Sequence, residues 1–130
     1  MSTPQLRRIL CVEDEPDIQT VARLALETVG GFEVAFCDTG AEAIERAPRF
    51  RPDLILLDVM LPEMDGPQTL AALRQLPDLR AVPVVFMTAK VQPGEVRRYL
   101  ELGVVDVIAK PFDPMVLPQR VRAIWERVHD

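Results

Sequence analysis

Short apolar runs alternate with segments of helical periodicity along the chain. The segment 7–12 is largely apolar and ends at the acidic run 13–15. Apolar residues then recur at helical spacing up to Gly30 and Gly31. Pro16 suits the first turn of a helix, and the paired glycines supply a left-handed stop. The pattern therefore predicts a strand followed by a helix.

The same alternation repeats four more times. We predict strands at 32–37, 53–57, 82–87 and 104–109, and helices at 39–47, 67–76, 93–102 and 115–128. Thr39 opens a Thr-x-x-Glu capping box. Continuous apolar strands that alternate with helices are typical of a parallel sheet covered on both faces. The predicted fold class is α/β, a doubly wound (βα)5 sheet of five parallel strands in a single domain over residues 1–130.

Composition narrows the classes of function. The 130 residues, 48% of them hydrophobic, suffice for one core, and the net charge of −5 repels nucleic-acid phosphates and anionic lipids. We therefore expect no direct nucleic-acid partner. No apolar run approaches the roughly 18 residues of a membrane span, and the first eight residues lack the pattern of a secretory signal. The expectation is a cytoplasmic protein without membrane contact.

Two cysteines, Cys11 and Cys37, lie inside apolar runs. Two thiols alone cannot form a zinc site, so we expect reduced, buried packing residues. A disulfide between them is the lesser alternative in a chain with an adequate core.

Polar side chains gather where the predicted strands end. Ligands of open α/β sheets bind beyond the carboxyl ends of the strands. The residues there are Glu13, Asp14, Asp58, Thr88 and Lys110. Three crowded carboxylates repel one another and call for a cation, and oxygen ligands without His or Cys favour Mg²⁺.

Asp58 differs from the other acids in its surroundings. Four aliphatic residues precede it and the open loop 61–66 follows it. A carboxylate beside Mg²⁺ and a lysine can attack a phosphoryl donor and form an aspartyl phosphate. The Thr88 hydroxyl would then donate to a phosphoryl oxygen and convert the chemical state of Asp58 into a loop movement.

Four motifs in order resemble the receiver domain of bacterial two-component response regulators over nearly the whole chain. They are Ile-Leu-Cys-Val-Glu-Asp-Glu at 9–15, Pro-Asp-Leu-Ile-Leu-Leu-Asp-Val-Met-Leu-Pro-Glu-Met-Asp-Gly at 52–66, Met-Thr-Ala at 87–89 and Lys-Pro-Phe at 110–112. The resemblance implies a flavodoxin-like, CheY-like sheet with strand order 2-1-3-4-5.

The resemblance also implies roles for the acidic residues. Asp58 would be the phosphoacceptor. Asp14 and Asp58 would bind Mg²⁺ together with the main-chain carbonyl of Met60, and Glu13 would assist through water. Many relatives have Asp where this chain has Glu13, yet the longer side chain can still reach a metal-bound water.

Further roles follow from the resemblance for the remaining strand ends. Thr88 and Lys110 would contact the phosphoryl group, and the Lys110–Pro111 peptide would be cis. Lys90 and Met60 would flank the site and tune hydrolysis of the aspartyl phosphate. Receivers usually carry Tyr or Phe three residues before the lysine, where this chain has Val107. The usual coupling of threonine to an aromatic side chain is therefore in doubt.

Other positions have simpler interpretations. Val96, Arg97, Arg98, Tyr99 and Glu101 form either a solvated surface or part of a docking face, which receivers build from their fourth helix, fifth strand and fifth helix. Trp125 is interpreted as a packing residue and the terminal His129 as inert. Asp65 and Gly66 suit a turn and a helix start, with Gly66 supplying an unusual backbone angle.

The leading hypothesis is a phosphorelay module rather than an enzyme. It takes its phosphoryl group from a sensor histidine kinase or a histidine phosphotransfer protein and then switches partner binding. It could act by binding another protein, by passing phosphate onward or as part of a longer regulator, and homodimerisation is possible.

Three alternatives differ in class. An aspartate-nucleophile phosphatase needs a second acid where Met60 stands. A flavin carrier needs a phosphate-binding loop where the acidic run 13–15 stands. A phosphorylation-independent adaptor is favoured only by Val107.

Overall fold

Strands and helices alternate in the computed structural model of the protein, which describes residues 4–130. The single-domain prediction over residues 1–130 includes residues 1–3, which lie outside this range. The elements are β1 (Arg8–Val12), α1 (Pro16–Arg23), the π-helix η1 (Leu24–Val29), β2 (Glu33–Cys37), α2 (Gly40–Phe50), β3 (Leu54–Asp58), α3 (Gly66–Arg74), the 3-10 turn η2 (Pro77–Leu79), β4 (Val84–Thr88), α4 (Pro93–Glu101), β5 (Asp106–Ala109) and α5 (Leu117–Val128). Among these residues no helix combines the length and hydropathy needed to cross a membrane.

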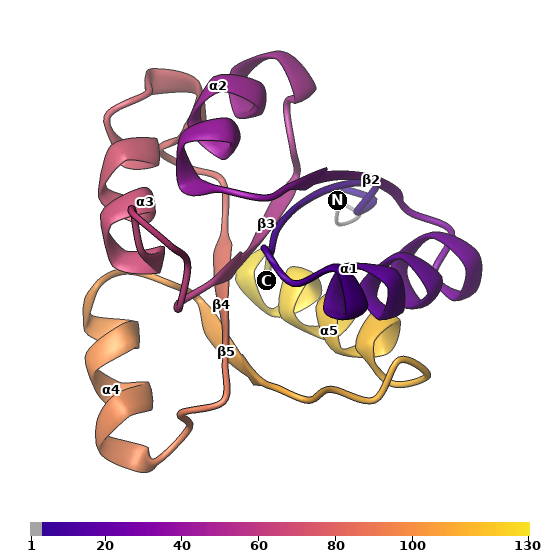
Figure 1. Cartoon of the computed structure of the whole chain (residues 1–130). Helices are drawn as coiled ribbons and strands as arrows, with labels where there is room; N and C mark the ends of the chain where they lie inside the picture. The colour runs from indigo at the N-terminus through magenta and orange to yellow at the C-terminus, as the bar shows by residue number, and fades with distance from the viewer. Residues whose placement is uncertain (1–3) are drawn as a thin grey trace.

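All strand pairs are parallel, in the order β2-β1-β3-β4-β5. Helices α2, α3 and α4 cover one face of the sheet, and α1 and α5 cover the other (Figure 1). The predicted α/β class and strand order are confirmed. This order makes β1 and β3 neighbours near the centre, so the residues that follow them meet at one edge.

The core divides into two layers because successive side chains of a strand point to opposite faces. All of β3 is buried. Ile55 and Leu57 pack toward α2, α3 and α4, whereas Leu54 and Leu56 pack toward α1 and α5. A strand that is apolar on both faces is the pattern from which the parallel sheet was predicted.

Helix α2 differs from its predicted end at residue 47. It continues to Phe50 through Pro48, and it stops where Arg51 adopts a left-handed φ of 58° and donates its N–H to the Ala47 carbonyl. Proline removes one helical hydrogen bond but does not have to end the helix at its own position.

The predicted capping box at the start of α2 forms only in part. The N–H of Glu42 donates to the Thr39 hydroxyl (3.0 Å), but the Glu42 carboxylate accepts from the N–H of Asp38 instead of that of Thr39. The complete capping box lies at the start of α3, between Asp65 and Gln68.

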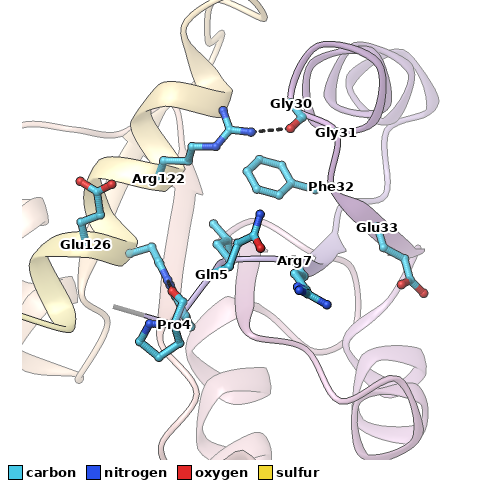
Figure 2. A pocket seen from close by; sticks show the side chains of 11 residues that line it. Pro4, Gln5, Arg7, Gly30, Gly31, Phe32, Glu33, Arg122 and Glu126 are labelled. Carbon is cyan, nitrogen blue, oxygen red and sulfur yellow. Dashed lines mark hydrogen bonds between the residues drawn. The ribbon is translucent and has the colours of Figure 1, made fainter. Parts of the chain in front are cut away.

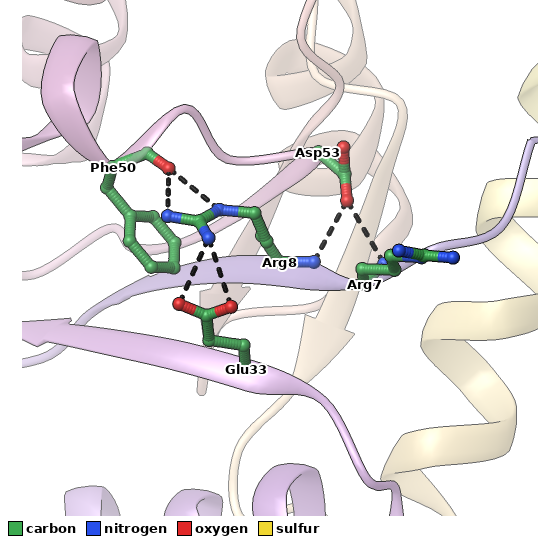
Figure 3. A network of polar contacts seen from close by, with 5 residues as sticks. All are labelled: Arg7, Arg8, Glu33, Phe50 and Asp53. Carbon is green, nitrogen blue, oxygen red and sulfur yellow. Dashed lines mark hydrogen bonds and ion pairs between the residues drawn. The ribbon is translucent and has the colours of Figure 1, made fainter.

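A polar network closes the amino-terminal edge of the sheet (Figure 3). The Asp53 carboxylate accepts the N–H groups of Arg7 and Arg8 (3.0 and 2.9 Å). The Arg8 guanidinium pairs with both oxygens of Glu33 and donates to the Phe50 carbonyl. The network joins β1 to β2 and to the connection before β3, which helps to fix the register of the central strands.

The two cysteines are free and buried, as predicted. Cys11 packs toward α1 and α5 and Cys37 packs on the opposite face, so the sheet separates the thiols. Burial raises the pKa of Cys37 to about 11 and raises the pKa of Cys11 further above its ordinary range.

We expect neither thiol to react with iodoacetamide at pH 8 while the protein is folded, because the nucleophile is the thiolate and both thiols are buried and protonated. Intact mass should show no adduct on the native chain and two adducts after unfolding in urea. Rapid alkylation of the native chain at either cysteine would contradict the predicted burial.

Candidate functional site

Three carboxylates meet where β1 and β3 end. Glu13 and Asp14 directly follow β1, and Asp58 is the last residue of β3. Each offers one oxygen, and these oxygens lie within 4.8 Å of one another. Glu13 is fully buried, Asp58 is 2% exposed, and Asp14 is half-buried. The structure thus brings together the three acids that the sequence placed in one site.

Lys110 reaches into this cluster from the end of β5. Its Nζ lies 2.9 Å from Oε1 of Glu13 and 3.2 Å from Oδ2 of Asp58. Burial by itself lowers the pKa of Lys110, but the hydrogen bond to Glu13 and the charge of Asp58 outweigh it and hold that pKa above its ordinary value. Burial raises the pKa of Glu13, which the hydrogen bond from Lys110 offsets only in part.

One ammonium against three carboxylates leaves the cluster short of positive charge. Carboxylate oxygens and a main-chain carbonyl are the donors that hard divalent cations prefer. The donor set of Glu13, Asp14 and Asp58 therefore fits a site for such a cation.

Backbone and amide groups fix Glu13. Its Oε2 accepts the N–H of Glu15 (3.0 Å). The Gln19 side-chain amide donates to the Glu13 carbonyl and to the Asp38 carboxylate. Gln19 was missed in the sequence, where a glutamine on the first helix has no pattern that marks it.

The loop after Asp58 is held close to β3. The N–H of Met60 donates to Oδ1 of Asp58 (3.2 Å), and the N–H of Gly66 donates to the Val59 carbonyl (2.9 Å). The helix start predicted at Asp65 and Gly66 is confirmed. However, Gly66 does not have a positive φ. Glycine is needed there because a Cβ would lie 2.8 Å from the Asp58 carbonyl oxygen and the Val59 Cα.

Thr88 ends β4 beside these groups and is buried. Its Oγ1 accepts the N–H of Lys90 (3.0 Å), and its carbonyl accepts the N–H of Lys110 (2.9 Å). The Lys110–Pro111 peptide is cis, as predicted. Thr88 is thus connected both to the loop that leads to α4 and to the lysine of the cluster.

The prediction that Tyr99 belongs to an exposed surface is wrong. Arg97, Arg98 and Glu101 are exposed, but Tyr99 is 4% exposed and is the only buried residue of α4. Its ring packs edge to face on Phe86, with 5.4 Å between the centroids. Such a pair adds about 0.5–1.5 kcal/mol beyond the burial of apolar area, which explains why this helix turns its aromatic residue inward.

Trp125 lies in the core, as predicted, and its indole N–H donates to the Pro4 carbonyl (2.6 Å). The ring of His129 packs against it at a tilt of 43°, with 3.8 Å between the centroids. This arrangement ties the amino-terminal segment to α5, far from the carboxylate cluster.

Two hollows differ in their relation to the cluster. One of about 690 Å³ adjoins Asp58 and Lys110 and is walled by apolar side chains that include Ile18, Val21 and Phe112. The other, of about 490 Å³, lies between the amino-terminal segment, the start of β2 and α5, where Arg122 donates to the Gly30 carbonyl (Figure 2). Only the first hollow opens on the residues of the site.

Comparison with known proteins gives a consistent result. The family model of the response regulator receiver domain matches residues 9–122. The chain is 40% identical over 121 residues to the alkaline phosphatase synthesis transcriptional regulatory protein PhoP of Bacillus subtilis, covering 93% of this chain and 49% of PhoP. It is 39% identical to the DNA-binding response regulator MtrA of Mycolicibacterium smegmatis, covering 95% of this chain and 53% of MtrA. The chain spans about half the length of these relatives.

Solved structures agree with the sequence comparison. The chemotaxis protein CheY4 of Vibrio cholerae superposes with a TM-score of 0.85 at 26% identity, covering 92% of this chain and 99% of CheY4. The signal receiver domain of a histidine kinase from Syntrophus aciditrophicus gives a TM-score of 0.80 at 38% identity, covering 94% of this chain and 92% of that one.

Replacing Gly66 with Ala should destabilise the protein by about 1–3 kcal/mol, because the new methyl group overlaps the backbone after Asp58. Urea unfolding measures the change. Gly94→Ala is the matched control, because a Cβ there meets no atom within 4 Å apart from its chain neighbours and the backbone of its own helix, and alanine favours the helix. Equal stability of the two variants would contradict the close approach at Gly66.

We expect magnesium to bind the assembled carboxylates and therefore to stabilise the folded protein by about 2.7 kcal/mol at a concentration 100 times its Kd. Asp14→Asn should lose most of this gain in thermal unfolding. Asp17→Asn removes an equal charge outside the carboxylate cluster and should retain it. If Asp14→Asn gained as much stability from magnesium as the unmodified protein, the cation would bind elsewhere.

Proposed function

The chain belongs to the family of response regulator receiver domains, and on this basis we propose that it is a phosphorylation-dependent signalling module whose phosphoacceptor is Asp58. The observation that carries the proposal is the carboxylate of Asp58, buried at the end of a central strand with the Lys110 ammonium 3.2 Å away and two further acids beside it. A buried aspartate that only capped a turn would need neither the lysine nor the other acids.

In the proposed reaction an oxygen of Asp58 attacks the phosphorus of a phosphohistidine. A P–O bond forms, the P–N bond breaks, and its electron pair stays on the imidazole, which takes up a proton. The N–H of Met60 holds Oδ1 of Asp58, and Lys110 pairs with Oδ2, so the carboxylate is oriented before the donor arrives. Lys110 also offsets negative charge that develops on the transferred group.

We propose Mg²⁺ as the cation of the site. Asp14, Asp58 and the main-chain carbonyl of Met60 would hold it, and Glu13 would act through a bound water. When bound, the ion would neutralise charge on the phosphoryl oxygens. The shortage of positive charge in the cluster supports this assignment.

Membership of the family implies a histidine kinase as a partner. We propose that the phosphohistidine of a sensor kinase or of a phosphotransfer protein enters over the apolar hollow beside Asp58, whose walls come from α1 and the segment after β5. The module is not an enzyme with turnover of its own; it assists its own phosphorylation and dephosphorylation. A cytoplasmic location fits this partner and the two free thiols.

We propose that these 130 residues by themselves do not bind nucleic acid. MtrA is described as DNA-binding, and this chain covers only 53% of it. A longer protein that contained this chain could bind DNA through another domain. Within the chain, we propose the face of α4, β5 and α5 as the output surface, for a protein target or a second copy.

A phosphorylation-independent adaptor is the second candidate, and Val107 is the observation that favours it. Val107 is buried beside β4 and has no ring that could change its exposure. The intact cluster of Asp58, Lys110 and the neighbouring acids favours the phosphorylated module instead.

Incubation with acetyl phosphate and Mg²⁺ should add one phosphoryl group per chain, measured as intact mass and removed by hydroxylamine, which cleaves acyl phosphates. Asp58→Asn should gain none, because the amide cannot act as the nucleophile. Asp78→Asn, an exposed position outside the cluster, should gain one group as the unmodified chain does. If the wild-type chain gained no phosphoryl group, the result would favour the phosphorylation-independent adaptor.

A further inference from the structure

Helix α4 contributes an aromatic ring to the core on its face of the sheet, near the end of β4. Phe86 pairs in register with Val107 of β5, and the ring of Tyr99 packs on Phe86 from α4. Tyr99, Phe86 and Val107 belong to the same core cluster. The core cluster that contains the small side chain of Val107 therefore also contains a buried ring from the neighbouring helix.

Phe86 and Thr88 point to the same face of the sheet, because they are two residues apart on one strand. Thr88 is also tied to the connection that leads to α4, since its Oγ1 accepts the N–H of Lys90. Only residues 89–92 separate β4 from α4. The Thr88 side chain is thus bonded to this short connection and lies on the same face of β4 as Phe86, on which Tyr99 packs.

Helix α4 depends on Tyr99 for its attachment to the sheet. Tyr99 is its only buried residue, and Val96 adds a partly buried contact. The Arg98 guanidinium lies 5.8 Å from the centre of the Tyr99 ring and reinforces it from the exposed side. A helix held by one buried side chain and one partly buried one can change position when the surface beneath them changes.

We propose that Tyr99 is the positioning residue that couples the chemical state of Asp58 to the position of α4, in place of an aromatic side chain on β5. This inference rests on the proposed phosphorylation of Asp58. When the Thr88 hydroxyl turns toward a phosphoryl group on Asp58, the connection at Lys90 follows it. The ring of Tyr99 then changes its packing on Phe86, and the exposed surface of α4 is presented differently to a partner.

The test uses the fact that Tyr99 is the only tyrosine of the chain. Protein grown with 3-fluorotyrosine carries one fluorine position, whose ¹⁹F resonance reports on this ring alone. Acetyl phosphate and Mg²⁺ should produce a second resonance whose share follows the phosphorylated fraction measured by intact mass. Asp58→Asn should keep a single, unshifted resonance under the same conditions.

The outcomes separate the two proposals. A phosphorylated chain with an unchanged resonance would overturn the role of Tyr99 and leave the phosphorylation of Asp58 standing. A chain that gained no phosphoryl group would overturn both.

Hydrogen exchange of the α4 amides is a second measurement, and it requires no fluorine on the ring. Phosphorylation should alter the exchange of the α4 amides in the wild-type chain and in Tyr99→Phe, which keeps the ring. It should leave α4 unchanged in Tyr99→Leu, whose α4 exchanges faster from the start. Leu100→Ala truncates an exposed neighbour and should respond as the unmodified chain does. If phosphorylation changed the α4 exchange of Tyr99→Leu as much as that of the wild-type chain, the proposal would be overturned.

Discussion

Repulsion between carboxylates at the ends of β1 and β3 is the constraint on which the site depends. The sheet order makes these two strands neighbours, so Glu13, Asp14 and Asp58 cannot separate without disrupting the central ladder. Lys110 compensates part of their charge from β5, on the far side of β4. The carboxyl-terminal edge is therefore held under unfavourable electrostatics by the apolar core beneath it, and a bound cation would stabilise it by relieving the repulsion.

Much of this arrangement could be predicted from sequence because it follows from topology. A residue placed at the end of a parallel strand must lie at the carboxyl edge of the sheet, whatever the details of packing. This is why Asp58 and Lys110, 52 positions apart in the sequence, could be assigned to one site. Side-chain contacts between elements carry no such signature. The amide of Gln19 and the close approach at Gly66 became visible only with the structure.

The error at Tyr99 has the same origin. The residues around it in α4 are charged, so the local pattern favoured an exposed surface, and nothing in the helix itself marks one aromatic residue as buried. Its burial depends on Phe86 of β4, on which the ring packs, and Phe86 lies in register with the small Val107 of β5. The small side chain of Val107 and the buried ring of Tyr99 thus belong to one core cluster, and only the structure brings them together.

The two ends of the sheet contrast in how they treat charge. At the amino-terminal edge, the carboxylates of Glu33 and Asp53 are matched by arginine and backbone N–H groups, and the network serves to hold strands together. At the carboxyl-terminal edge, acids outnumber their partners, and burial raises the pKa of Glu13 despite the adjacent lysine. Balanced charge fixes a structure, whereas unbalanced charge at a buried edge gives a site whose stability changes with what it binds. The phosphoacceptor that we propose therefore lies at the edge where acids outnumber their partners.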